Sequence, residues 1–130
     1  MASSARSPSQ LAINFFTKAI NQQNFDVMAQ VLSPDYTYNG EASSLEGNKE
    51  WVIGLHAKYP GLEFTFEDML EEGLKAAFRW RMTAPASGDR PAGWTTGTNI
   101  LQALDGQIVS NFQNGLASSS WTPPAAESGT

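Results

Sequence analysis

The sequence contains no cysteine and only one histidine in 130 residues. Disulfide bonds and thiolate chemistry are therefore excluded, and so is a metal site built from several histidines. Carboxylates that could bind a hard cation are present. We nevertheless expect neither a metal nor any other cofactor.

Positive charge is also scarce, with 8 Lys and Arg residues against 13 Asp and Glu residues and a formal net charge of -5. This balance, without a run of basic residues, argues against a nucleic-acid partner. No apolar stretch approaches the length of a membrane span, and the start MASSARSPS lacks the apolar segment of a secretory signal. We expect a soluble cytoplasmic protein with no nucleic-acid or membrane partner.

The hydrophobic content of 41% is enough for one buried core in one domain. We expect a disordered lead over residues 1–8, a folded domain over 9–117 and a flexible tail over 118–130. Helix caps, apolar periodicity and turn residues then predict the order of elements. We expect helices beginning at Ser7 and Asn24, a helix over 48–58, and strands over 35–39, 62–70, 74–84, 94–104 and 107–116.

The strand over 74–84 allows two interpretations. Phe78, Trp80 and Met82 alternate with Arg79 and Arg81, so both faces carry large side chains. If the aromatic set covers the core, the arginines are solvated on the outer face and take no part in chemistry. If the arginines face inward, they need carbonyl, carboxylate or phenolate partners. The order of elements itself predicts an α+β fold with helices on one face of a curved antiparallel sheet.

Seven segments in this order resemble the SnoaL-like polyketide cyclase branch of the NTF2-like superfamily. The resemblance covers about residues 10–116. The segments are FF at 15–16, LSPDYTYNG at 32–40, EGNKEW at 46–51, KYPGLEFTFEDML at 58–70, GLKAAFRWRMTA at 73–84, TG at 96–97 and DGQIV at 105–109. The resemblance implies an NTF2-like cone, in which a curved antiparallel sheet wraps three N-terminal helices around an internal pocket. It also implies a homodimer.

The resemblance implies a catalytic site as well. Matching the pattern of ketosteroid isomerases and limonene epoxide hydrolases places Arg79 and Arg81 on the pocket side, where two guanidinium groups could stabilise an enolate or phenolate. Asn99 falls near the position of the isomerase acid that bonds the oxyanion. Asn114 lies on the last strand, from which characterised polyketide cyclases supply an aspartate. That strand offers only Asn111 and Asn114 here, so their aldol mechanism does not carry over.

Few residues of this sequence could transfer a proton to or from a substrate. His56, near the end of its helix, is a candidate proton shuttle or else a boundary residue. Glu41 is a weaker candidate base. The residues expected to contact a substrate are Tyr36, Tyr38, Trp51, Phe64, Leu101 and Phe112.

We therefore expect a cofactor-independent cyclase or isomerase of secondary metabolism that acts on a polyketide-like or terpenoid small molecule. Folding of the substrate would supply much of the rate, because orienting reacting ends can contribute roughly 7–11 kcal/mol. A superfamily fold does not fix the reaction, since its members include binding and transport modules. The alternative is thus a non-catalytic ligand-binding or dimerisation module.

Overall fold

The computed structural model describes residues 7–115. The expected tail over 118–130 and most of the expected lead lie outside this range. Pro8 lies in the first turn of the first helix, as the cap at Ser7 predicts. The helices are α1 (Pro8–Asn14), η2 (Phe15–Asn21), α2 (Phe25–Val31) and α3 (Leu45–Lys58), and the strands are β1 (Leu32–Tyr38), β2 (Glu41–Ala42), β3 (Glu63–Glu72), β4 (Lys75–Ala84), β5 (Gly93–Leu104) and β6 (Gln107–Gly115).

Side-chain caps set where the helices begin. The Ser7 hydroxyl accepts from the amide of Gln10 at 3.2 Å, and the Asn24 side chain accepts from the amide of Val27 at 3.2 Å, as predicted. Ser44 caps α3 by accepting from Gly47 at 2.9 Å. This third cap starts α3 at residue 45, three residues before the sequence-based boundary.

The first helix changes geometry at Phe15, where the α-helical α1 continues as the π-helical η2. The wider π turn brings Phe15, Phe16, Ala19 and Ile20 to the buried side together. At its end, Asn21 clamps β3: its side chain accepts from the Phe64 amide at 2.8 Å and donates to the Phe64 carbonyl at 3.0 Å.

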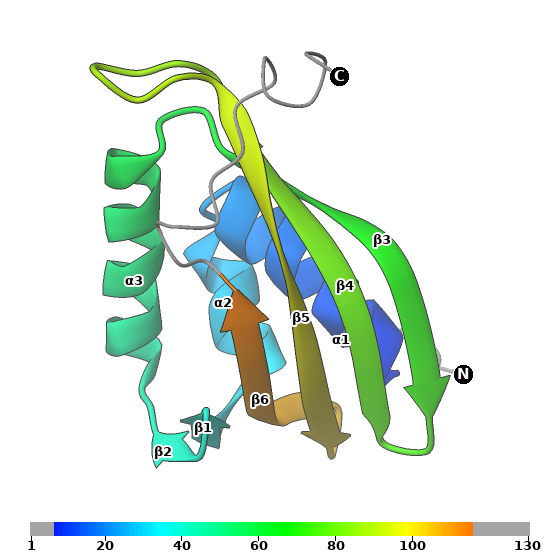
Figure 1. Ribbon diagram of the computed structural model, residues 1–130. Helices are drawn as coiled ribbons and strands as arrows, with labels where there is room; N and C mark the ends of the chain where they lie inside the picture. The colour runs from blue at the N-terminus through cyan, green and yellow to red at the C-terminus, as the bar shows by residue number, and fades with distance from the viewer. Residues whose placement is uncertain (1–6, 116–130) are drawn as a thin grey trace.

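The six strands form one curved sheet in the order β2-β1-β6-β5-β4-β3. Adjacent strands pair antiparallel, except that β1 and β6 are parallel. The sheet is therefore mixed, whereas the sequence predicted a wholly antiparallel one. The helices lie on one face of it (Figure 1). Within residues 7–115, no helix has the length and apolar content that crossing a membrane requires.

The buried face of the sheet carries the aromatic set of β4. Phe78, Trp80 and Met82 are buried, and the Phe16 ring packs edge-on against Phe64 and Phe78 at centroid distances of 5.2 and 5.3 Å. Because β4 alternates without a bulge, Arg79 and Arg81 lie on the outer face.

Two β-bulges, one in β3 and one in β6, shift the alternation of side chains along their strands. In β3, the register passes from Phe66 opposite Trp80 to Asp68 opposite Arg79, so Glu67 is the extra residue. In β6, a second shift lets Ile108 and Asn111 both face inward, although they are three residues apart. The second bulge decides which residues of β6 reach the interior.

Candidate functional site

A cavity of about 230 Å³ lies between β1, β6 and the start of α3. Aromatic rings form its apolar walls, and amide and hydroxyl groups form the rest. The residues that line it are Phe15, Tyr36, Tyr38, Ser43, Gly47, Asn48, Trp51, Asn111 and Gln113. This mixture of apolar walls and a few convergent polar groups is typical of small-molecule sites.

The parallel pairing of β1 with β6 brings the two strands of the cavity together. Tyr38 pairs with Asn111 in this ladder. The β6 bulge turns Asn111 and Gln113 inward and leaves Phe112 outside, with half of its surface exposed. The early start of α3 then places Asn48 and Trp51 across from them.

Behind the cavity, a chain of hydrogen bonds crosses the four strands β4, β5, β6 and β1. The indole N–H of Trp80 donates to Oδ1 of Asn99 at 2.7 Å, and Nδ2 of Asn99 donates to Oδ1 of Asn111 at 2.8 Å. Nδ2 of Asn111 then donates to the hydroxyl oxygen of Tyr36 at 3.2 Å. All four side chains are at least 97% buried. Such a buried, satisfied network holds its members in a single arrangement.

The two tyrosines of the cavity remain protonated well above neutral pH. Burial raises the pKa of Tyr36 to about 12, with a smaller opposing effect from the hydrogen bond of Asn111. Burial also raises the pKa of Tyr38. Both hydroxyls therefore keep their protons at neutral pH, and each can donate a hydrogen bond.

A second polar group lies at the start of α3. Nδ2 of Asn48 donates to the Ser43 hydroxyl at 2.9 Å and to the Ser44 carbonyl at 2.8 Å. Both amide hydrogens are thus used within the protein, which leaves Oδ1 of Asn48 as an acceptor. Among the described residues that line the cavity, none is charged and none is a histidine. The cavity can donate and accept hydrogen bonds, but it supplies no carboxylate or imidazole base.

Three of the residues expected to contact a substrate, Tyr36, Tyr38 and Trp51, do line the cavity. Asn99 lies directly behind it and acts on it through Asn111. These four residues come together as the sequence suggested, although Asn99 does not face the cavity itself.

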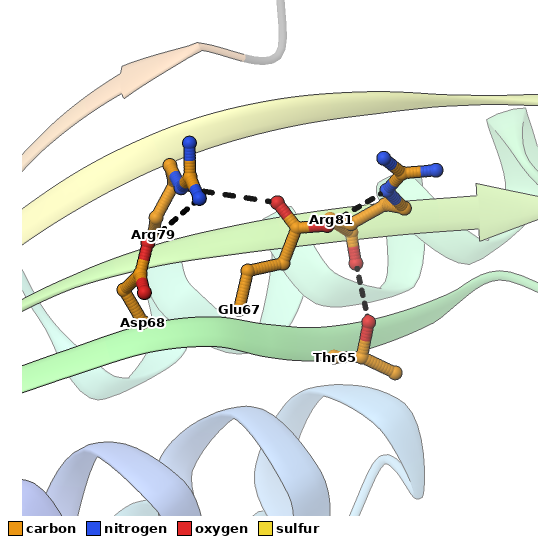
Figure 2. Close-up of polar contacts among 5 residues, drawn as sticks. All are labelled: Thr65, Glu67, Asp68, Arg79 and Arg81. Carbon is orange, nitrogen blue, oxygen red and sulfur yellow. Dashed lines mark hydrogen bonds and ion pairs between the residues drawn. The ribbon is translucent and has the colours of Figure 1, made fainter.

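The expectation that Arg79 and Arg81 face the pocket is wrong. Arg79 pairs with Asp68 at 2.7 Å and Arg81 with Glu67 at 3.0 Å on the outer face of the sheet (Figure 2). The β3 bulge supplies both acids to that face. Arg81 also lies over the ring of Trp94, 4.1 Å from its centre. Neighbouring side chains of the same protein and solvent therefore satisfy these guanidinium groups, without a ligand.

The outer face also carries Asn114 and Phe112. Their expected inward direction is wrong because the β6 bulge reverses which residues of the strand face inward. Phe64 and Leu101 are buried in the core and do not line the cavity. The His56 Nε2 atom lies 2.7 Å from the Ile20 carbonyl oxygen, so the ring joins α3 to the end of η2. Glu41 is exposed on β2.

Five further residues line the cavity that were not predicted from the sequence as site residues: Asn111, Gln113, Asn48, Ser43 and Phe15. Plain alternation from the turn at Asp105 places Ser110, Phe112 and Asn114 together, which hides Asn111. The bulge that turns Asn111 inward has no marker in the local sequence.

A curved mixed sheet packed against helices, with a cavity between them, gives this chain the NTF2-like cone fold. The SnoaL-like domain family model matches residues 12–111. The chain therefore belongs to the SnoaL-like family.

Solved structures support the same fold. A SnoaL-like polyketide cyclase from Agrobacterium tumefaciens has a TM-score of 0.74 and 15% identity over 88% of this chain and 94% of that one. Wild-type IdmH from Streptomyces antibioticus has a TM-score of 0.73 and 19% identity over 84% and 91%. TsrD from Streptomyces laurentii has a TM-score of 0.67 and 21% identity over 82% and 86%. No curated protein sequence matches this chain.

Proposed function

We propose that this chain is a cofactor-independent cyclase or isomerase that acts on a polyketide-like or terpenoid intermediate in the cavity around Tyr36. Family membership supports a role of the polyketide cyclase type. The single observation that carries the proposal is a buried, protonated tyrosine that a hydrogen-bonded chain holds against an apolar cavity. Phe15 and Trp51 provide apolar walls that would fold a flat substrate.

The proposed chemistry needs no charged base. In an intramolecular conjugate addition, an enol carbon forms the new C–C bond to the far carbon of an enone, and negative charge collects on the enone oxygen. The enol proton then moves to the resulting enolate, so substrate and product are isomers. Tyr36 would donate a hydrogen bond to that oxygen, a contribution on the order of a few kcal/mol if it strengthens in the transition state.

A non-catalytic ligand-binding module is the second candidate. One observation favours it: among the described residues around the cavity, none titrates near neutral pH or carries charge. A carrier needs only shape and hydrogen bonds, and this cavity offers both. The two candidates differ in whether the bound molecule changes.

We also propose that the chain forms a homodimer through the outer face of the sheet. Leu70, Ala77, Ile100 and Phe112 are successive cross-strand partners there, and the three larger side chains are 72%, 53% and 51% exposed. The outer face of the four strands β3, β4, β5 and β6 covers roughly 600 Å². This area is close to the ~800 Å² that each partner of a stable dimer buries.

Charge on this face also suits a second copy of the chain. The ion pairs of Arg79 and Arg81 neutralise Asp68 and Glu67, whereas the whole chain has a net charge of -5. Sedimentation velocity should give a dimer for the wild type and a monomer for Ile100→Asp. A wild-type monomer at tens of micromolar would contradict the proposed interface.

Metabolite profiling of the encoding organism tests the function. The gene would be deleted and then restored as wild type, as Tyr36→Phe, or as the outer-face control Arg81→Met. We expect deletion to replace one product by an uncyclised or isomeric compound, which wild type and Arg81→Met reverse and Tyr36→Phe does not. An unchanged profile after deletion would refute the enzymatic function.

A further inference from the structure

The hydrogen-bond chain behind the cavity has a direction, and Trp80 sets it. An indole N–H can donate but cannot accept, whereas each asparagine amide can turn either end toward a neighbour. Because the indole faces Asn99 at 2.7 Å, Asn99 must present its oxygen there and its amino group to Asn111. Asn111 must then present its own amino group to Tyr36.

Tyr36 lies at the end of this directed chain. Its oxygen accepts from Asn111, so its proton is free to point elsewhere, and none of residues 7–115 accepts that proton. The ring lines the cavity, where a ligand oxygen can be reached. Gln113 follows the same rule: its Oε1 accepts from Asn99 at 3.3 Å, which leaves its amino group as a donor.

We propose that Trp80 is a positioning residue that fixes the Tyr36 hydroxyl as a donor, so that the cavity selects uncharged ligands through a ketone or enone oxygen. The inference rests on the proposed function only in taking this cavity as the ligand site. The ligand class follows from the direction of the Tyr36 hydroxyl. A hydroxyl that donates into the cavity stabilises a ligand with an acceptor oxygen, and it forms no hydrogen bond with a hydrocarbon.

Removal of the indole N–H would allow the direction of these hydrogen bonds to reverse. Tyr36 could then donate to Oδ1 of Asn111, and the amino group of Asn111 could donate to Oδ1 of Asn99. The amino group of Asn99 would turn toward the aromatic ring at position 80, a weak but available acceptor. In the reversed state, the Tyr36 hydroxyl presents its lone pairs to the cavity, and a ketone oxygen beside it loses this donor.

A matched pair of probes tests the proposal. 1-Tetralone and tetralin have nearly the same shape, but only the first has a carbonyl acceptor. Wild type should bind 1-tetralone about tenfold more tightly by calorimetry, the value expected for one buried neutral hydrogen bond. The infrared carbonyl stretch of bound 1-tetralone should move to lower frequency.

Two substitutions reverse the hydrogen bond between position 111 and Tyr36 in different ways. Trp80→Phe keeps an aromatic ring and removes the N–H, and Asn111→Asp keeps the shape and makes position 111 an acceptor for the Tyr36 proton. Both should reduce the ketone preference to about twofold or less and abolish the infrared shift, with tetralin affinity unchanged. Trp94→Phe, on the outer face, is the control and should keep the wild-type preference.

Circular dichroism first establishes that each variant folds, and Asn111→Asp decides the direction of the Tyr36 proton if Trp80→Phe does not fold. A wild-type ketone preference that persists in the folded variants overturns the proposal. So does wild-type protein that binds both probes equally or neither of them. Metabolite profiling, which does not depend on these probes, separately decides the proposed function.

Discussion

Gly97 is the position where one added methyl group should do the greatest damage. It lies opposite Trp80 in the β4–β5 ladder, and a Cβ there would lie 2.7 Å from Cε2 of the indole. It would come closer still to Cζ2 of that ring and to the backbone oxygen of Asn114. Since the Asn114 oxygen is backbone, Gly97→Ala cannot be relieved by a change of side-chain rotamer alone.

The cost follows from two effects. Overpacking of a dense core costs up to about 3 kcal/mol. Displacement of the indole also breaks its hydrogen bond to Asn99, which contributes about 1 kcal/mol. We therefore expect Gly97→Ala to lower the free energy of unfolding by about 4 kcal/mol, a large share of the roughly 5–15 kcal/mol of a typical domain.

Urea denaturation followed by circular dichroism and tryptophan fluorescence measures this change. Gly54→Ala is the matched control, because a Cβ at position 54 meets nothing within 4 Å. It should stabilise α3 by about 0.5–1 kcal/mol, the helix preference of alanine over glycine. If Gly97→Ala unfolds within about 1 kcal/mol of wild type, the placement of Trp80 against β5 is refuted.

Three further predictions concern the tyrosine, the arginines and the histidine. Because the pKa of Tyr36 is raised to about 12, native Tyr36 holds its proton when the unfolded chain has lost it, so stability should fall by about 2–3 kcal/mol between pH 10 and 12. Tyr36→Phe should flatten this fall in alkaline urea titrations, and an equally steep fall would contradict the assignment. Replacing Arg79 and Arg81 with Met should lower the free energy of unfolding by about 1–2 kcal/mol, and by less at high salt. It should leave 1-tetralone binding unchanged, and weaker binding would show that these arginines contribute to the site. His56→Ala should lower stability by about 1–2 kcal/mol through the lost bond to Ile20, again without an effect on 1-tetralone affinity, whereas impaired ligand binding would indicate a role in the site.

Local sequence rules predicted most of the fold. The caps at Ser7 and Asn24, the alternation from Leu62 to Phe66 and the turn at Asp105 each depend on neighbouring residues alone, and the structure contains all of them. The parallel pairing of β1 with β6 joins segments about 75 residues apart and has no local marker. Long-range pairing of this sort is decided by the packing of the whole domain.

The site was predictable only in part. The rings of Tyr36 and Tyr38 were found because β1 has no competing assignment, whereas β4 offered two bulky faces, and the resemblance favoured the wrong one. Burial of Trp80 in place of Arg81 avoids the cost of an unpaired guanidinium in the core. Asn111 was missed because a single bulge residue reverses the facing of everything after it in the strand.

We propose above that the cavity around Tyr36 converts its ligand without a cofactor. The most direct test incubates the compound that accumulates in the deletion strain with purified protein dialysed against EDTA, and follows product by mass spectrometry and NMR. We expect conversion to an isomer of the same mass, at least tenfold slower with Tyr36→Phe and unchanged with Arg81→Met. Saturable binding without any conversion would contradict it and establish the chain as a carrier.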